Sequence, residues 1–383
     1  MTKSIGVVLA LAAVFFGYLI WENRRAIKDR RAIKHVVYVN GTRGKSSTTR
    51  LIDGGLRAAG LRVFCKTTGT LPMTINTDGV EQLIHRRGAA NIREQLQILH
   101  KAAKEHADVL VIECMAVNTV YQNISQHRMV RADIGVITNV RLDHTDVMGE
   151  TLPEIAEALS NTIPKAGILF TAEQEQFSVL AKNAQALGTK IFQVLPEESL
   201  ATIDWPDNVA LALAVCDQLG VNRETALFGM NTFYQRDPYA LSFYRVGNGA
   251  LFINGLSIND LQSTLKVFET LHKKLEFGKG KFILLLNSRA DRASRTIQMA
   301  ELVRDLTPDS LWLLGSGRKL LYHTLPRRIS KEKMPEIQLY KSAAKLEFSG
   351  LQPEDVIFAA GNIAMEGKKL MDRIREEGTP DVL

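Results

Sequence analysis

Residues 41–46 read Gly-Thr-Arg-Gly-Lys-Ser, a set of residue types and spacings that can bind phosphate. They follow the apolar run Val36–Val39 and precede a helical pattern of apolar residues. A loop between a strand and a helix directs backbone N–H groups and the positive end of the helix toward an anion. Gly41 and Gly44 would permit the tight backbone, and Lys45 would reach the β- and γ-phosphates of a nucleotide.

This loop departs from the general phosphate-loop pattern, G-x-x-x-x-G-K-[ST]. Val39 stands where the first glycine belongs, so only the shorter pattern remains. Ser46 or Ser47 would offer a hydroxyl to Mg2+, and Thr42 and Arg43 complete the predicted nucleotide loop. An ordinary turn between strand and helix is the alternative.

Two further polar residues lie at the ends of predicted strands. Glu113 ends the run Val-Leu-Val-Ile-Glu, and His144 follows Ile134–Asn139 after a short loop. Open α/β sheets bind ligands at the carboxyl ends of their strands. Because carboxylate, imidazole and hydroxyl can share a Mg2+ ion or its waters, Glu113, His144 and a loop serine predict a metal site. A loop histidine bonded to a neighbour is the alternative for His144.

Elements that could position these residues recur along the chain, since short β-branched runs alternate with longer segments of helical period. The predicted strands are Val36–Val39, Val109–Glu113, Ile134–Asn139, Ile168–Thr171, Leu251–Asn254, Phe282–Asn287, Leu311–Leu314 and Val356–Ala360. This alternation predicts an α/β fold with mostly parallel sheets. Turn residues in Gly229–Ala240 indicate a boundary between an ATP-binding domain, 35–232, and a smaller Rossmann-like domain, 233–383.

The first 34 residues predict a membrane anchor. Ile5–Trp21 contains no charge, and its length of about 17 residues is at the lower limit for spanning a bilayer. A cleaved signal peptide is the alternative, but no small-residue cleavage site follows the apolar run. Basic residues follow the run, whereas only Lys3 precedes it; they are Arg24, Arg25, Lys28, Arg30, Arg31 and Lys34. This asymmetry predicts a single-pass protein of the cell membrane with its catalytic domains in the cytoplasm.

Composition excludes several classes of protein. The formal net charge is +7, and the basic residues after the anchor account for most of it. Attraction of this cluster to anionic lipid explains the charge without a nucleic-acid partner. The three cysteines, Cys65, Cys114 and Cys216, are far apart and have no metal-binding spacing, so a reduced compartment is expected.

Four segments together resemble the Mur ligase family of ATP-dependent amide ligases. They are GTRGKSS at 41–47, KTTGT at 66–70, VIECMAVN at 111–118 and TNVRLDHTDVMG at 138–149. Three later segments, 252–265, 285–296 and 359–367, are similar to the C-terminal domain of the poly-γ-glutamate synthase branch of that family. The resemblance covers the chain from about Val36 to its end, and there is no room for the domain with which cell-wall ligases bind their nucleotide sugar.

The resemblance implies a reaction. Family members transfer the γ-phosphate of ATP to a carboxylate, and an amine attacks the resulting acyl phosphate to form an amide. In this branch both substrates would be glutamate or a growing poly-γ-glutamate chain. Small membrane subunits that complete the synthase and export its product are implied partners, and homo-oligomerisation stays open.

The resemblance also implies roles for further residues. Thr67 and Thr68 match hydroxyls near a metal and the γ-phosphate, with Thr68 as a metal ligand beside Ser46, Glu113 and His144. Residues matched to the nucleotide pocket are Asn208, Asn259 and Asp260. Residues matched to a glutamate site at the domain cleft are Arg289, Asp291 and Arg292. For these later residues, loop or helix capping is the alternative.

Two features of the family have no clear counterpart. Lys165 lies near the place where many members carry a carbamoylated, catalytic lysine, although the poly-γ-glutamate branch does not reliably keep it. An arginine that contacts the phosphates after the domain linker could be Arg236 or Arg245. The sequence decides neither assignment.

Three rival functions are left. A folylpolyglutamate synthase-like ligase shares the chemistry, but the anchor speaks against it. A membrane-tethered P-loop ATPase would turn over ATP without glutamate. A catalytically inactive scaffold is disfavoured by the presence of Lys45, Glu113 and His144.

Overall fold

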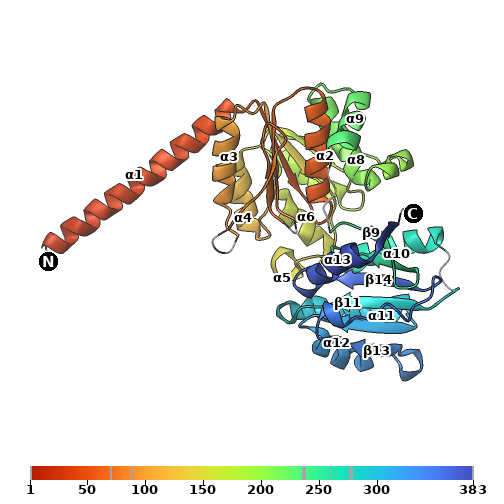
Figure 1. The fold of residues 1–383 in the computed structure, drawn as a ribbon. Coiled ribbons are helices and arrows are strands. Elements are labelled where there is room, and N and C mark those ends of the chain that lie inside the picture. The colour runs from red at the N-terminus through yellow and green to blue at the C-terminus, as the bar shows by residue number, and fades with distance from the viewer. Residues whose placement is uncertain are drawn as a thin grey trace. The chain divides into compact units, whose positions relative to one another are not determined.

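The chain folds into two compact units, Met1–Gln235 and Arg236–Leu383 (Figure 1). The computed structural model describes residues 2–69, 71–86, 88, 90–234, 239–258, 260–275 and 279–381. The three cysteines are buried and free. The α/β fold with mostly parallel sheets, expected from the alternation of strand and helix patterns, is confirmed.

The first unit is built on an eight-stranded sheet of order β4-β3-β2-β5-β1-β6-β7-β8. Its strands are β1 His35–Asn40, β2 Val63–Thr67, β3 Met73–Ile75, β4 Glu81–Leu83, β5 Val109–Glu113, β6 Ile134–Ile137, β7 Ile168–Thr171 and β8 Lys190–Gln193. The six strands from β2 to β8 in this order are parallel, and β3 and β4 extend one edge antiparallel.

Helices cover both faces of this sheet. They are α1 Thr2–Ala32, α2 Lys45–Ala58, α3 Glu94–Lys104, α4 Thr119–Ile124, α5 Thr145–Met148, α6 Leu152–Ser160, α7 Phe177–Ala186, α8 Pro206–Gln218 and α9 Arg223–Phe233. Alternate residues of a strand point to opposite faces. Accordingly Val37 and Val39 belong to the core under α2, α8 and α9, whereas Val36 and Tyr38 belong to the core under α3.

The parallel strands bring the candidate residues to one edge of the sheet. β1 lies between β5 and β6, so the carboxyl ends of all three strands meet where the loop 41–44 leaves β1. β6 ends at Ile137, two residues before the predicted end of this strand. Beyond Ile137, the Thr138 N–H still donates to Asn40 O at the end of β1, at 3.0 Å. Asn139 O instead accepts from the Thr42 N–H in the loop after β1, at 3.0 Å.

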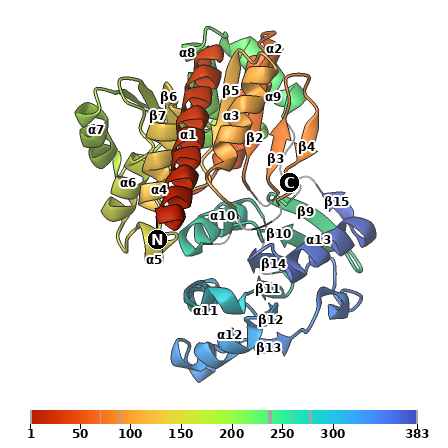
Figure 2. The same ribbon diagram turned by 90° about the vertical axis from the view of Figure 1, so that its left-hand side faces the viewer.

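Helix α1 continues without a break from the apolar run into the basic segment and packs beside α3 (Figure 2). Among the described residues it is the one helix long and apolar enough to span a bilayer, and its apolar window is entirely unburied. Its second half is tied to the first unit, because Arg30 pairs with Asp133 at 2.5 Å and Asp29 contacts His100 at 3.0 Å. The second half of α1 is therefore part of the packed unit and not a free tether.

The second unit contains a seven-stranded sheet of order β13-β12-β11-β14-β10-β9-β15. Its strands are β9 Ser242–Val246, β10 Ala250–Asn254, β11 Phe282–Asn287, β12 Ser310–Leu314, β13 Glu336–Leu339, β14 Val356–Gly361 and β15 Thr379–Asp381, and its helices are α10 Leu261–Lys274, α11 Ala293–Leu306, α12 Arg318–Thr324 and α13 Glu366–Glu377. The strands from β13 to β10 are parallel, and β9 and β15 are antiparallel at one edge.

Candidate active site

The loop after β1 has the backbone that a phosphate-binding turn needs. Gly44 precedes α2 with φ of 81°, and a Cβ placed on it would lie 2.2 Å from Asn208 Oδ1. Gly41 has φ of 126°, and its Cβ would lie 2.1 Å from Thr138 Oγ1. Side chains at these two positions would be both strained and crowded, so both glycines are required by the geometry.

Residues at the end of β6 hold the loop in place. The Thr138 hydroxyl donates to Arg43 O at 2.5 Å, and Asn139 both accepts from the Arg43 N–H and donates to Arg43 O, each at 3.1 Å. The Thr42 hydroxyl accepts from the Arg141 N–H at 3.0 Å. Sequence reasoning did not assign roles to Thr138 and Asn139, although both belong to the segment 138–149 that carries the family resemblance.

Lys45 is the first residue of α2, and its side chain folds back over the loop. Its Nζ donates to Gly41 O at 2.6 Å and to Thr42 O at 3.2 Å. Burial lowers the pKa of Lys45, and the negative charge of Glu113 opposes this shift. Ser46 and Ser47 follow in the first turn of α2, half-buried like Lys45. An ammonium, a hydroxyl and the start of a helix thus converge on the same place.

Glu113 is the acidic centre of this edge and is only 2% exposed. Its Oε2 accepts from the Ser46 hydroxyl at 2.8 Å and from the Thr68 N–H at 2.6 Å. The predicted residues Ser46, Thr68 and Glu113 are therefore brought together from α2, from the loop after β2 and from β5. Thr68 takes part through its backbone, and Thr67 is the buried last residue of β2.

His144 lies in the loop after β6, where it has a left-handed backbone with φ of 49°. Its Nε2 is 3.9 Å from Asp143 Oδ2, and the same carboxylate oxygen pairs with Arg43 at 3.1 Å. Asp143 connects His144 to the nucleotide loop and was not among the predicted site residues. The structure thus places His144 in the loop after β6, close to Asp143, and its role at a metal site stays a prediction.

Oxygen donors at this edge fit a divalent metal ion that prefers oxygen ligands. Mg2+ prefers hard oxygen ligands and usually binds through one or two carboxylates, waters and substrate phosphates. Ser46 and Glu113 supply one hydroxyl and one buried carboxylate beside Lys45. Within the described part of the chain no three His, Cys, Asp or Glu side chains gather as a metal cluster.

Lys165 does not belong to this cluster. It is exposed in the turn that precedes β7, and its charge acts on His127 in the π-helical segment Ser125–Val130 before β6. Because β7 is parallel to β6, a residue before β7 lies at the amino ends of the strands, and the nucleotide loop is at their carboxyl ends. The structure therefore places Lys165 at the edge of the sheet opposite the nucleotide loop, and its catalytic role stays a prediction.

Two of the three residues matched to the nucleotide pocket lie within the described chain. Asn208, buried in the first turn of α8, accepts from the Thr48 hydroxyl at 3.3 Å and lies against Gly44. Asp260 caps α10, since its side chain accepts from the Ser263 N–H at 2.8 Å, so the structure gives it the capping role that was the alternative. Asn259 lies outside the described residues.

The structure describes one of the two candidates for the phosphate-binding arginine. Arg236 lies outside the described residues. Arg245 lies on β9, pairs with Asp381 at 2.7 Å and donates to Gly249 O at 3.2 Å, so its guanidinium is used within the edge of the second sheet.

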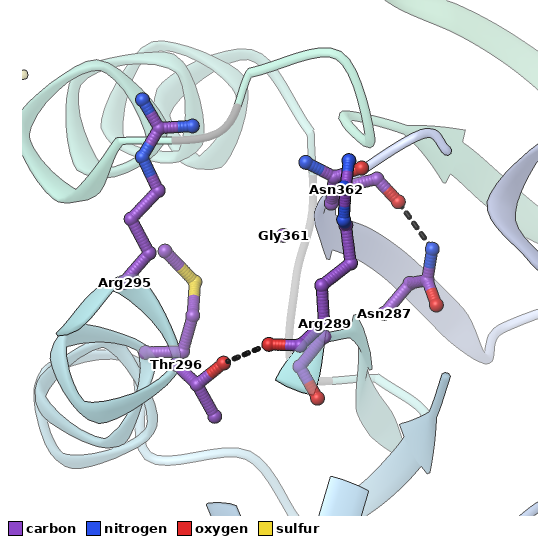
Figure 3. Close-up of a pocket in the computed structure, with 8 residues that line it drawn as sticks. Asn287, Arg289, Arg295, Thr296, Gly361 and Asn362 are labelled. Carbon is purple, nitrogen blue, oxygen red and sulfur yellow. Dashed lines mark hydrogen bonds between the residues drawn. The ribbon is translucent and has the colours of Figure 1, made fainter. Parts of the chain in front are cut away.

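A pocket in the second unit contains one of the predicted glutamate-binding residues, Arg289, opposite Arg295 (Figure 3). Its lining residues are Asn287, Ser288, Arg289, Arg295, Thr296, Met299, Gly361 and Asn362. Arg289 makes two hydrogen bonds to Asp291, at 2.9 and 2.6 Å, so this predicted pair is in direct contact. The side chain of Arg292 lies outside the described residues.

The rest of the pocket is shaped by Asn287, which donates to Asn362 O and, at 3.1 Å, to Ala364 O (Figure 3). Asn287 is the last residue of β11, and Asn362 directly follows the neighbouring strand β14. Sequence reasoning missed Asn287, Asn362 and Arg295, although polar residues at the ends of two predicted strands were a usable signal.

Comparisons with known proteins agree with the geometry. Residues 39–210 match the Mur ligase middle domain, and residues 242–377 match the poly-gamma-glutamate synthase CapB C-terminal domain. A capsule biosynthesis protein CapB of Bacillus anthracis is 40% identical to this chain, and the match covers 79% of this chain and 67% of that protein. A PGA synthase CapB of Bacillus subtilis strain 168 is 34% identical, and the match covers 96% of this chain and 97% of that protein.

A solved structure shares the fold at low identity. The bifunctional folylpolyglutamate synthase/dihydrofolate synthase of Yersinia pestis, complexed with AMPPNP and a Mn ion, superposes with a TM-score of 0.66 at 16% identity, over 93% of this chain and 92% of that one. The glycine loop with Lys45, the buried Glu113 and the two matched domains lead to one conclusion. This chain belongs to the CapB family of poly-γ-glutamate synthases, ATP-dependent amide ligases built on the Mur ligase fold.

Proposed function

We propose that this protein forms γ-glutamyl amide bonds, with ATP and glutamate or a poly-γ-glutamate chain as its substrates. The observation that carries the proposal is the cluster at the carboxyl ends of β1, β2 and β5. There Glu113 Oε2 accepts from Ser46 and Thr68 beside the ammonium of Lys45. A carboxylate is a poor electrophile, so coupling to ATP is needed to turn one of its oxygens into a leaving group.

In the first step an oxygen of the substrate carboxylate attacks the γ-phosphorus of ATP. The bond between the γ-phosphorus and the β,γ-bridging oxygen breaks. ADP is released, and the substrate carboxylate becomes an acyl phosphate. Lys45 neutralises charge on the phosphoryl group, and the N–H groups at the start of α2 orient it. The amine of a second glutamate then attacks the acyl carbon, phosphate leaves with the C–O electron pair, and the ammonium proton passes to solvent.

Magnesium is the divalent ion that we propose for this site, where it would neutralise charge on the β- and γ-phosphates. Ser46 and Glu113 would hold it, and the buried position of Glu113 keeps this carboxylate in one orientation. We propose supporting roles for the Thr68 hydroxyl and for His144, and for Asn208 behind the loop. Oxygen ligands and one or two carboxylates are what Mg2+ prefers.

We propose that the pocket of the second unit binds the glutamate that supplies the amine. Arg289 and Arg295 lie on its two sides (Figure 3), and a guanidinium can hold a carboxylate through two parallel hydrogen bonds. Asp291, paired with Arg289, would then orient this guanidinium or contact the substrate ammonium. Arg292 keeps a proposed part in the same site.

Glutamate dependence of ATP turnover tests the proposed function. In membranes containing the full chain with its native partners, phosphate release from ATP and Mg2+ should rise on addition of D- or L-glutamate, and mass analysis should find γ-linked oligomers. A tethered ATPase without ligase activity would release phosphate equally without glutamate. A folylpolyglutamate synthase-like enzyme would stay inactive until a folate is added. Either result would contradict the proposal.

We also propose that α1 holds the enzyme at the cytoplasmic face of the cell membrane, next to small membrane subunits that export the polymer. A polyanion cannot cross a bilayer unaided, because every buried carboxylate is costly. The exposed apolar side chains of α1, such as Val14 at 72% and Phe16 at 62%, support insertion in lipid. Synthesis next to an exporter would hand the chain over as it grows.

Removal of the apolar part of α1 is expected to abolish surface polymer without abolishing ATP binding. The deletion should stop before Glu22, since Ala26 and Ile33 are buried in the first unit and Arg30 pairs with Asp133. A variant retaining residues 22–383 is compared with one in which an unrelated transmembrane helix of the same orientation replaces residues 2–21. Polymer outside the cell is measured at equal protein level. Full export by the shortened variant would refute the role of the anchor, and failure of the replacement helix would point to specific contacts of residues 2–21.

A further inference from the structure

Lys66 is a fully buried lysine on β2, one strand away from Glu113. Its side chain is 0% exposed, and its Nζ lies 3.1 Å from Glu94 Oε1 and 3.8 Å from Met115 Sδ. Burial lowers the pKa of Lys66, whereas the charges of Glu94 and Glu113 oppose this shift. A buried ammonium is costly unless it is paired, so its place in the core needs a reason.

Glu94, the partner of Lys66, is the first residue of α3 and is itself held firmly. Arg86 donates to its two oxygens at 2.7 and 3.0 Å. The next residue, Gln95, donates from Nε2 to Glu113 O at 3.3 Å. The first turn of α3 therefore contacts both neighbouring strands, β2 through Lys66 and β5 through Glu113.

These contacts meet at the loop that follows β2. Two residues after Lys66, the Thr68 N–H donates to Glu113 Oε2 at 2.6 Å, and the same oxygen accepts from Ser46 at 2.8 Å. Two donors on one carboxylate oxygen restrict rotation of the carboxylate. The orientation of Glu113 thus depends on where the end of β2 is fixed.

We propose that Lys66 is a positioning residue for the metal site: its buried pair with Glu94 fixes the end of β2, so that Thr68 holds the Glu113 carboxylate in the orientation that binds the cation. Lys66 acts through Thr68 and not by contact with the nucleotide. The inference rests on the metal role proposed above for Glu113. Partners that orient a metal ligand typically change metal affinity by about 10- to 100-fold when they are removed.

Stability alone does not explain a lysine at this position. Replacing a buried ion pair by apolar groups of similar volume is often neutral or stabilising. Methionine has nearly the length of the lysine side chain, and in Lys66→Met the Glu94 carboxylate still pairs with Arg86. The variant should therefore fold. If packing alone mattered, methionine would serve equally well at position 66. The neighbour Met115 shows that a methionine side chain is accommodated in this part of the core.

The test compares Lys66→Met with Arg86→Met in the full-length protein. Both variants remove one cation from Glu94, but Arg86 does not lie on β2. Binding of Mn2+ with AMPPNP is measured by electron paramagnetic resonance, and hydrogen exchange is measured in peptides covering residues 67–69. For Lys66→Met we expect an approximately tenfold higher Kd for Mn2+ and faster exchange of the Thr68 amide, at an unchanged unfolding midpoint. Arg86→Met should leave the Kd for Mn2+ within about twofold of the wild-type value. Such a change is well below the about 10- to 100-fold loss expected when a residue that orients a metal ligand is removed.

Three results would overturn the inference: an unchanged Kd for Mn2+ in Lys66→Met, an equal loss in Arg86→Met, or a loss that merely follows a lower unfolding midpoint. If Lys66→Met does not fold, Glu94→Gln replaces it with the same readouts and the same expectation, because it removes the charge that holds Lys66. Glu113→Gln separates this inference from the proposed function. If Glu113→Gln also binds Mn2+ like the wild type, the metal role of Glu113 is wrong; if it alone loses Mn2+, only the role of Lys66 is wrong.

Discussion

Lys45→Ala is expected to lower ATP turnover by about 10³-fold, the loss typical of removing a group that stabilises charge in the transition state. The ammonium lies over the loop, 2.6 Å from Gly41 O and 3.2 Å from Thr42 O, where phosphate oxygens would bind. Alanine favours the helix at this first position of α2, and burial of the ammonium is itself costly. The unfolding midpoint should therefore stay close to that of the wild type.

The measurement is phosphate release at saturating ATP, with circular dichroism on the same sample to verify folding. Lys101→Ala, an exposed substitution of the same type in α3, is the matched control and should keep wild-type turnover. If folded Lys45→Ala kept wild-type turnover, the assignment of residues 41–46 as a phosphate-binding loop would be wrong. Equal losses in both variants would indicate a general effect of removing positive charge.

Glu113→Gln should have the second largest effect, raising the Mg2+ concentration needed for half-maximal turnover by about 10- to 100-fold or more, as expected for loss of a charged metal contact. The amide has the shape of the carboxylate, and its oxygen can still accept from Ser46 and Thr68, so the fold should persist. What is lost is a negative charge in a place only 2% exposed, where solvent cannot replace it.

Magnesium titrations of turnover check this expectation, with Glu157→Gln on the exposed face of α6 as the control. His144→Ala should give a smaller shift in the same direction, because the imidazole is linked to the loop through Asp143 and not directly to Ser46. Wild-type magnesium dependence in both Glu113→Gln and His144→Ala would show that the proposed metal site is wrong.

Local sequence signals were sufficient for the loop and for most central strands. All eight predicted strands are present, and only the end of β6 differs from its predicted position by more than one residue. Each is a short, mostly apolar run that is largely buried on both faces, so consecutive residues are enough to identify it. The strands that were not predicted, β2, β3, β4, β8, β9, β13 and β15, include the short edge strands, where burial is less complete and the apolar pattern is weaker.

The sequence by itself determined that Gly41, Gly44, Lys45 and Ser46 form a tight turn that opens a helix, because strand, loop and helix are contiguous there and backbone geometry depends on neighbouring residues. The tertiary structure alone decided which distant residues join the turn. β2 pairs with β5, so the Thr68 N–H reaches a carboxylate 45 positions along the chain. The same strand order buried Lys66 against α3, and strand direction placed Lys165 at the opposite edge. Strand pairing and direction follow from how separate amphipathic elements share one core, and this is a property of the whole unit and not of any single segment.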